Sequence, residues 1–317
     1  MPRMVDVAQR AGVSTATVSR VLNGKAVRQD LTEAVQRAVE DLEYSPDRTA
    51  RSLRRRHSAV VALILPDVEN PFFTSVARGV EDVAAQAGYS VVLCNSDELP
   101  EKERRYLGVA ESENMAGVII APTGSKPRLE GLLERGRALV VLDREVRQPV
   151  DQVAFDNRSL GRKATQLLID QGYRLIACVT GPTKVSTAVE RAKGWRDAMT
   201  AAGLDAPNDY LLRRSFRVDG GLVAVDELLE LPQPPQAVLA TNNLSAVGVL
   251  RAVAQRNVQG KLGVAVIGDL PFATAPLENV VIVPLNPRGM GVTAAKMLVE
   301  RIDGLDLPPR KVVFGVG

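Results

Sequence analysis

Apolar residues near the start of the chain recur at helical spacing in two short segments that meet at Gly12. Gly12 suits the left-handed conformation that ends a helix, and Ser14 suits the cap of the next helix. The pattern therefore predicts a helix-turn-helix, whose second helix can lie in the major groove of DNA. The residues expected to be buried are Val5, Ala8 and, as a weaker candidate, Val7 in the first segment, and Val18, Val21 and Leu22 in the second.

A third helix is predicted from about Leu31 to Leu42, because apolar residues share one face: Leu31, Val35, Ala38 and Leu42. After it, Ser45 suits a helix cap and Pro46 suits a first helical position, which predicts a short helix over 47–55. So short a helix is marginal alone, and its arginines favour ordering when phosphates arrive. We assign residues 1–46 to a DNA-binding domain and 47–58 to a hinge helix and linker.

Beyond Ser58, short apolar runs alternate with amphipathic helices. This alternation is typical of parallel sheets covered by helices on both faces. Helices are predicted through Val76–Ala87, from Asn157 to about Asp170, and after Pro287. Strands are predicted at Val60–Leu65, Tyr89–Cys94, Ala116–Ala121, Ala138–Leu142, Leu175–Thr180, Ala237–Ala240 and Val264–Gly268, with a last strand after Pro308 and Pro309.

The expected fold class is therefore an all-α helix-turn-helix head followed by an α/β core of two doubly wound parallel-sheet lobes. Residues 59–156 and 286–305 are assigned to the N-terminal lobe and 157–285 to the C-terminal lobe. Residues 306–317 form a final crossover or strand whose lobe is left open. Ligands of such folds bind at the carboxyl ends of strands, which places a site in the cleft between the lobes.

The composition is that of a globular protein, with 317 residues of which 45% are hydrophobic. No apolar run reaches about 18 residues and no apolar signal core opens the chain, so neither a membrane span nor a secretion signal is expected. Cys94 and Cys178 each lie in a strand-like apolar run. They are expected to be reduced core thiols of a cytoplasmic protein rather than a disulfide or metal site.

The charge is unevenly distributed between the head and the body. Residues 1–58 hold eleven basic and seven acidic residues, a balance of +4, whereas the rest holds 29 basic and 30 acidic residues, a balance of −1. Five arginines fall within residues 48–56. A phosphate-binding head on a neutral body explains this asymmetry, and a solvated charged face is the alternative.

An enzyme is the competing class of function. The single histidine, His57, lies in the basic hinge, so no Ser-His or Cys-His pair can be built in the body. Gly289 to Ala294 fits a dinucleotide fingerprint, but a lone match is weak, and ordinary helix entry with close packing is the better explanation of these glycines. We expect no catalytic residues, no metal and no cofactor. An architectural DNA-binding protein without an effector is a second alternative, although it would not need a two-lobed body.

The order of several motifs resembles the lactose-repressor (LacI/GalR) family of bacterial transcription factors over essentially the whole chain. The motifs are Val5 to Gly24, Tyr44-Ser-Pro with Ala50-Arg-Ser-Leu53, Pro66 to Phe73, Leu142-Asp-Arg144, Asp156-Asn157 with Gly161, and Glu190-Arg191 with Gly194-Trp195. The resemblance implies a homodimer, with a tetramer left open, that binds a near-palindromic double-stranded DNA operator. It also implies a periplasmic-binding-protein-like core that closes on a small effector, without a membrane partner.

The resemblance also assigns DNA contacts. It implies base-edge contacts for Thr15, Ala16 and Arg20, where Arg20 suits guanine and Thr15 or Ala16 a thymine methyl. Phosphate contacts are expected for Ser14, Thr17, Ser19, Asn23 and Arg51. Leu53 would wedge between the central base pairs from the minor groove, or alternatively pack on its symmetry mate. Two residues depart from the family pattern, Asp47 in place of asparagine and Arg28 in place of a Ser or Thr cap.

Effector contacts are expected at predicted strand ends: Asn70, Phe72, Phe73, Asp143, Arg144, Arg191, Asn242 and Asp269. Aromatic rings suit the apolar faces of a sugar, and a carboxylate with a guanidinium suits adjacent hydroxyls. The set favours a monosaccharide or a derivative over a purine base. A core aromatic remains the alternative for Phe72, and a structural salt link for Asp143 and Arg144. Two residues of the family pattern are missing after Gly268, which leaves the place of Asp269 open.

We therefore expect a cytoplasmic, nucleoid-associated transcriptional repressor that responds allosterically to a sugar or sugar derivative.

Overall fold

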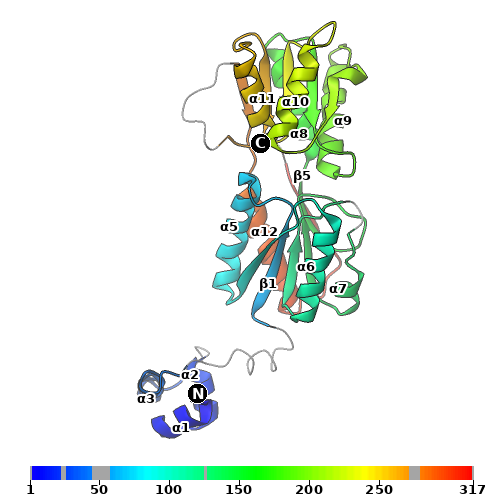
Figure 1. Cartoon of the computed structure of the whole chain (residues 1–317). Coiled ribbons are helices and arrows are strands. Elements are labelled where there is room, and N and C mark those ends of the chain that lie inside the picture. Colours follow the sequence, from blue (N-terminus) through cyan, green and yellow to red (C-terminus); the bar gives the residue numbers. More distant parts are fainter. Residues whose placement is uncertain (1, 23–25, 45–57, 125–126, 271–278, 316–317) are drawn as a thin grey trace. The chain divides into compact units, whose positions relative to one another are not determined.

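The computed structural model describes residues 2–22, 26–44, 58–124, 127–270 and 279–315. The chain divides into two compact units, Met1–Ser58 and Ala59–Gly317, and each is described by itself. Figure 1 draws the first unit in dark blue and the second from cyan to red. The predicted hinge helix over 47–55 lies outside the described residues.

The first unit contains the predicted helix-turn-helix. Helix α1 (Met4–Ala11) ends at Gly12, whose φ of 67° is left-handed and whose N–H donates to the carbonyls of Ala8 and Gln9. Helix α2 (Thr15–Leu22) begins after Ser14, whose Oγ accepts a hydrogen bond from the Thr17 N–H at 3.2 Å. Both glycine and serine therefore act as their chemistry predicts.

Helix α3 (Gln29–Asp41) closes a small core over α1 and α2. The prediction for Val5 was wrong, since its side chain is 56% exposed. The buried face of α1 instead carries residues three or four apart, a spacing that leaves Val5 on the solvent side. The buried residues of this core are Val7, Ala8, Val18, Val35, Ala38 and Tyr44, while Val21, Leu22 and Leu42 are partly buried against them.

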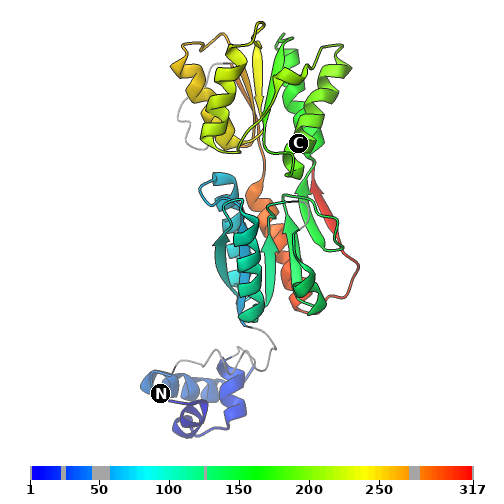
Figure 2. The same ribbon diagram turned by 45° about the vertical axis from the view of Figure 1, so that its right-hand side comes forward.

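The second unit begins with a sheet of six strands in the order β11-β5-β4-β3-β1-β2, and all neighbouring pairs are parallel. Helices α5 and α12 cover one face, while α6 and α7 cover the other (Figures 1 and 2). The elements are β1 (Val60–Leu65), α5 (Pro71–Gln86), β2 (Ser90–Asn95), α6 (Pro100–Ser112), β3 (Gly117–Ile120), α7 (Glu130–Glu134), β4 (Ala138–Leu142), β5 (Asp151–Phe155), α12 (Pro287–Ile302) and β11 (Lys311–Phe314).

A second parallel sheet follows in the order β10-β9-β8-β6-β7. Trp195 lies in its core with no exposed surface. Cys178 is a buried free thiol there, and burial raises its pKa to about 12. The elements are α8 (Asn157–Asp170), β6 (Ile176–Thr180), α9 (Ser186–Ala201), a 3-10 turn (Asn208–Tyr210), β7 (Leu211–Arg213), α10 (Val218–Leu229), β8 (Ala237–Ala240), α11 (Asn243–Gln255), β9 (Gly263–Ile267) and β10 (Val280–Val283).

The seven strands predicted by range after Ser58 are all present, with each end within one residue of its expected position. Strands β5, β7 and β10 were not predicted. Strand β11 pairs with β5, Lys311 opposite Gln152, so the last strand belongs to the first sheet. Because every strand of a sheet runs the same way, the carboxyl ends meet at one edge, where a ligand site is expected.

The glycines of the dinucleotide-like segment serve helix packing. A Cβ on Gly291 would lie 2.2 Å from the backbone carbonyl oxygen of Val76, so α12 can approach α5 this closely only with glycine there. Arg288 at the start of α12 also donates to Asp82 of α5 at 2.6 Å. The close-packing alternative is therefore sufficient to explain this segment.

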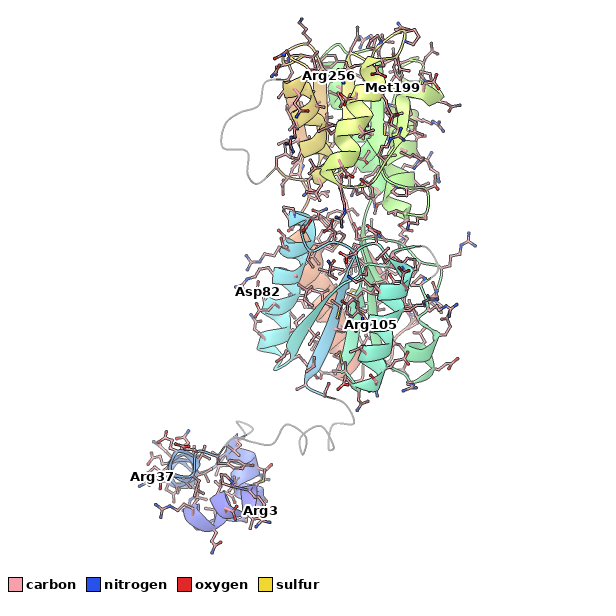
Figure 3. All side chains as sticks on the ribbon, in the orientation of Figure 1. Arg3, Arg37, Asp82, Arg105, Met199 and Arg256 are labelled. Atoms are coloured by element: carbon pink, nitrogen blue, oxygen red, sulfur yellow. The ribbon has the colours of Figure 1, made fainter. Side chains whose placement is uncertain are left out.

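Charged side chains point outward from the helices, as at Arg37, Arg105 and Arg256 (Figure 3). Met199, by contrast, is fully buried in the second lobe. None of the described helices combines the length and apolar character needed to cross a membrane.

Candidate functional site

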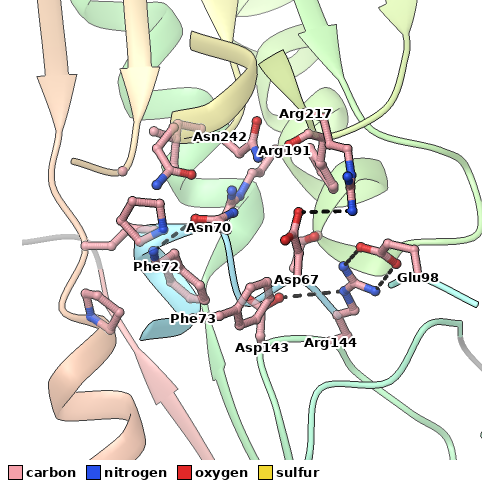
Figure 4. Close-up of a pocket in the computed structure, with 18 of the residues that line it drawn as sticks. Asp67, Asn70, Phe72, Phe73, Glu98, Asp143, Arg144, Arg191, Arg217 and Asn242 are labelled. Atoms are coloured by element: carbon pink, nitrogen blue, oxygen red, sulfur yellow. Dashed lines mark hydrogen bonds and ion pairs between the residues drawn. The ribbon is translucent and has the colours of Figure 1, made fainter. Parts of the chain in front are cut away.

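The second unit holds a cavity of about 260 Å³ whose lining comes from both lobes (Figure 4). The first lobe contributes the segments that follow β1, β2 and β4, and the second lobe contributes α9 and the segments that follow β6, β7, β8 and β9. All eight residues predicted as effector contacts line it: Asn70, Phe72, Phe73, Asp143, Arg144, Arg191, Asn242 and Asp269.

Two phenylalanines form the apolar part of the lining. Asn70 caps α5 and accepts a hydrogen bond from the Phe72 N–H at 2.9 Å, which sets the start of the helix that carries both rings. The Phe72 and Phe73 rings meet edge to face, with centroids 5.0 Å apart. Phe72 also lies 6.2 Å from Phe155. Phe72 therefore belongs both to the cavity wall and to the core behind it.

Asp143 is a buried carboxylate that lacks a hydrogen-bond donor among the described residues. Its exposure is 6%, and Arg144 is its only cationic neighbour within 4 Å in the part of the chain that the structure describes, with 3.8 Å between Oδ2 and Nε. Its backbone φ of 63° is left-handed, which is uncommon for a residue other than glycine. Burial raises the pKa of Asp143, and the positive charges of Arg144 and Arg191 oppose this rise.

Arg144 is held by the first lobe. Its two terminal nitrogens donate to the Glu98 carboxylate, at 2.8 Å for Nη1, and Nη1 also donates to the Pro122 carbonyl at 2.9 Å. Burial lowers the pKa of Arg144, but the carboxylates of Glu98 and Asp143 outweigh this and raise it. Arg144 therefore forms the structural salt link that was the alternative to an effector contact, but its main partner is Glu98 rather than Asp143.

Arg191 reaches the cavity from α9 and is 5% exposed. Its Nε donates to Asn157 Oδ1 at 2.8 Å and its Nη1 to the Thr241 carbonyl at 2.6 Å. Burial lowers the pKa of Arg191 to about 10, although the Asp143 carboxylate partly offsets this. No carboxylate of the described residues forms an ion pair with it within 4 Å, so its buried charge is incompletely compensated.

Asn242 and Asp269 complete the predicted set. Asn242 caps α11 by accepting from the Ser245 N–H at 3.0 Å, and its Nδ2 donates to the Phe216 carbonyl at 3.0 Å. Asp269 is exposed at the cavity, and partial burial raises its pKa. The shortened segment after Gly268 therefore still brings Asp269 to the cavity.

Sequence reasoning missed five charged or aromatic residues of the lining: Asp67, Glu98, Lys184, Phe216 and Arg217. Asp67 and Glu98 follow β1 and β2, so the strand-end rule that found Asp143 would also have found them. Phe216 and Arg217 follow β7, which was not predicted. Arg217 lies 3.6 Å from Asp67, an ion pair that joins the second lobe to the first.

The predicted DNA contacts lie on the first unit. Thr15, Ala16 and Arg20 are exposed on α2, and Arg20 forms no ion pair within the described part of the chain. Ser14 is exposed, and its Oγ lies 2.9 Å from the Thr17 hydroxyl. Thr17 and Ser19 are half-buried. The remaining predicted residues, Asn23, Asp47, Arg51 and Leu53, lie outside the described residues.

The two units match two known protein families. Residues 3–47 match the bacterial regulatory proteins of the lacI family, and residues 58–311 match the periplasmic binding proteins and sugar binding domain of the LacI family. The chain belongs to the LacI family. It is therefore a DNA-binding transcriptional repressor with a sugar-binding domain rather than an enzyme.

Individual relatives span nearly the whole chain. The chain is 35% identical over 312 residues to the ribose operon repressor of Escherichia coli K12, covering 95% of this chain and 93% of that protein. A solved complex of the transcriptional regulator CelR with cellobiose is 30% identical with a TM-score of 0.74, covering 99% and 97%. The lac repressor dimer bound to operator, at 21% identity, has the same fold with a TM-score of 0.85, covering 99% and 96%.

Proposed function

We propose that this LacI-family repressor binds a near-palindromic operator as a homodimer in the cytoplasm and senses a neutral monosaccharide in the cavity between its lobes. The observation that carries the effector assignment is Asp143, a buried carboxylate to which none of the described residues donates a hydrogen bond, in a cavity that is also lined by Arg191, whose buried charge is incompletely compensated. A buried polar group of this kind is costly unless a partner completes it. A ligand that carries adjacent hydroxyls supplies donors to Asp143 and acceptors to Arg191 at once.

The other residues that line the cavity also favour a sugar as the effector. The Phe72 and Phe73 rings provide apolar surface beside these charged groups, as the two sides of a sugar ring require. The cavity of about 260 Å³ is slightly below the roughly 300–1,000 Å³ of drug-sized pockets, which suits a single ring better than a disaccharide. Among the relatives, one is named for a ribose operon and another was solved with cellobiose.

Exposed apolar side chains support the homodimer. On the first lobe several lie on and after the edge strand β2, with Leu307 and Val313 before and on the opposite edge strand β11, and on the second lobe they lie on α10, α11 and β10. Such apolar surface commonly marks a protein interface, and a two-fold operator requires two recognition helices. The other residues are Val92, Leu93, Leu99 and Val109 on the first lobe, and Val223, Val247 and Ile282 on the second, each 38% exposed or more.

In the proposed mechanism, the effector changes the relative orientation of the two lobes and, through it, the spacing of the two hinge segments at residues 47–58. The hinge helices then order differently on the operator, where each Leu53 acts as a wedge. Thr15, Ala16 and Arg20 read base edges in the major groove, and Ser14, Thr17, Ser19, Asn23 and Arg51 contact phosphates.

A thermal-shift screen of the purified protein tests the effector assignment. Pentoses, hexoses, their phosphates and nucleosides are added separately, and the melting temperature is measured. A ligand that binds only the folded state must raise it, so at least one neutral monosaccharide is expected to do so. A rise with nucleosides alone would overturn the sugar assignment.

Sedimentation of the protein with synthetic two-fold-symmetric duplexes tests the assembly. Two protein chains per duplex are expected, and a single chain on every duplex would contradict the dimer.

A further inference from the structure

Glu98 occupies an unusual position at the carboxyl end of β2. Both Asp97 and Glu98 have left-handed backbone conformations, with φ values of 51° and 59°. The Glu98 N–H donates to the Pro66 carbonyl at 3.2 Å, which fixes the segment against the end of β1. This strained turn presents the Glu98 carboxylate at the cavity wall, beside Arg144 (Figure 4).

Glu98 and the Pro122 carbonyl together engage most of the N–H donors of Arg144. A guanidinium has five N–H donors. Three of them are engaged, two by the Glu98 carboxylate and one by the Pro122 carbonyl. The Nε is buried without a hydrogen-bond partner. The two remaining N–H donors, on Nε and Nη2, lie on the side where Asp143 Oδ2 is 3.8 Å from Nε, so the fork that would bind a carboxylate or phosphate already faces a carboxylate.

The charge of Arg144 is also outweighed. Glu103 lies behind it with 3% exposure, its carboxylate accepting the Thr123 N–H at 2.6 Å, and its negative charge acts on Arg144. Burial raises the pKa of Glu103. Together with Glu98 and Asp143, the one guanidinium has three carboxyl groups around it. A ligand at this end of the cavity meets the carboxylates of Glu98 and Asp143, and the nearby lining residue Arg217 is itself paired with Asp67 at 3.6 Å.

We propose that Glu98 is the specificity-determining residue that reserves this end of the cavity for uncharged hydroxyl groups and rejects anionic substituents. This inference deepens the proposed function and rests on it for the identity of the site. Without the Glu98 charge, Arg144 loses its hydrogen-bonded counter-ion and keeps only the more distant charges of Asp143 and Glu103, and the same end of the cavity then accepts phosphate. Glu98 thus decides whether the cavity discriminates between a sugar and its phosphate ester.

The test compares the wild type with Glu98→Gln, which keeps the shape of the side chain and removes its charge. Melting temperatures of the full-length proteins are measured in inorganic phosphate and in chloride at matched ionic strength. We expect phosphate to raise the melting temperature of Glu98→Gln by several degrees more than that of the wild type. Glu101→Gln, an exposed neighbour on α6, should behave as the wild type does, and so should Glu98→Asp, which retains the charge.

Titrations with D-ribose and D-ribose 5-phosphate provide the second arm. The ratio of the two affinities should shift toward the phosphate ester by tenfold or more in Glu98→Gln. If inorganic phosphate changes the melting temperatures of Glu98→Gln and the wild type equally, the inference is overturned, regardless of the sugar affinities. If no sugar binds the wild type, the proposed effector class fails, and the phosphate arm still decides the role of Glu98.

If Glu98→Gln does not fold in either buffer, the titrations of the wild-type protein decide the question. Tighter binding of D-ribose 5-phosphate than of D-ribose overturns the inference, and tighter binding of D-ribose supports it.

Discussion

At the scale of single residues, the cavity contains buried charged groups whose burial is energetically unfavourable until a ligand binds them. Asp143 is ionisable, nine-tenths buried and without a hydrogen-bond donor among the described residues, and Arg191 is buried without a carboxylate partner. Substituting a residue that contacts the ligand should therefore change the response to the effector more than it changes the stability of the fold. This separation of roles makes single substitutions informative.

Arg191→Ala should abolish the effector response and leave operator binding within a few-fold of the wild type, because the side chain belongs to the second unit and not to the unit that contains the helix-turn-helix. Fluorescence anisotropy on an operator duplex, with and without the sugar found by thermal shift, checks this. Lys193→Ala, an exposed position on the same helix, is the matched control. A normal response in Arg191→Ala would remove this residue from the site.

The raised pKa of Asp143 predicts a pH dependence of stability. The folded state holds this proton more tightly than the unfolded chain, so ionisation of Asp143 destabilises the fold at neutral pH, and the penalty disappears as the pH falls through the raised pKa toward the ordinary value of 3.8. Asp143→Asn should therefore raise the free energy of unfolding by about 1 kcal/mol at pH 7, as relieved functional sites commonly do.

Urea unfolding at several pH values measures this difference. The stability advantage of Asp143→Asn should shrink as the solution is acidified, and an advantage that grows instead would show that the burial of the charge is not its cause. Sugar affinity should change in the opposite sense, falling in the variant at pH 7.

At the scale of elements, continuous apolar runs and helix signals predicted most of the fold. Strands such as β1 and β4 are buried on both faces, so their sequences carry the pattern directly. Strand β7 consists of three half-buried residues, and β10 has an exposed face. Their sequences therefore lack the continuous apolar run that would predict a strand. The pairing of Arg144 with Glu98 joins positions 46 residues apart, which no local pattern reveals. Most of the eight cavity residues were predictable because parallel strands end at one edge, whereas Arg191 reaches the cavity from within α9.

Helix crossings position the cavity residues, and a glycine substitution tests this. A Cβ on Gly194 of α9 would lie 2.0 Å from the backbone carbonyl oxygen of Arg158 in α8, so Gly194→Ala must separate the two helices. The cost should be about 1–3 kcal/mol, as for overpacking in a core. Arg191 lies one turn earlier on α9, so sugar affinity should fall as well.

Gly108→Ala on α6 is the control for this substitution, because nothing lies within 4 Å of its Cβ. Alanine has the higher helix propensity, so this variant should gain up to about 1 kcal/mol. Chemical denaturation of both variants gives the comparison, and similar changes in the two would show that the contact between α8 and α9 is not limiting.

At the scale of the whole molecule, the proposed mechanism requires communication between a small cationic unit and a larger near-neutral one. Leu53→Ala is expected to weaken binding to a specific operator by at least about tenfold, or about 1.4 kcal/mol, because the wedge at the operator centre is lost. Binding to random DNA, which rests on phosphate contacts, should change little. Parallel titrations at one salt concentration measure both, and equal losses would contradict the wedge.

Reciprocity gives the sharpest test of allostery in the intact protein. If the sugar changes operator affinity by some factor, the operator must change sugar affinity by the same factor, because both follow from one thermodynamic cycle. Factors of roughly 5–150 correspond to typical coupling free energies of about 1–3 kcal/mol. Operator affinity is measured with and without saturating sugar, and sugar affinity with and without saturating operator. We expect the two ratios to agree for the wild type and to fall to one in Arg191→Ala. Coupling ratios in Arg191→Ala that equal those of the wild type would show that the sugar acts at a place other than the cavity between the lobes.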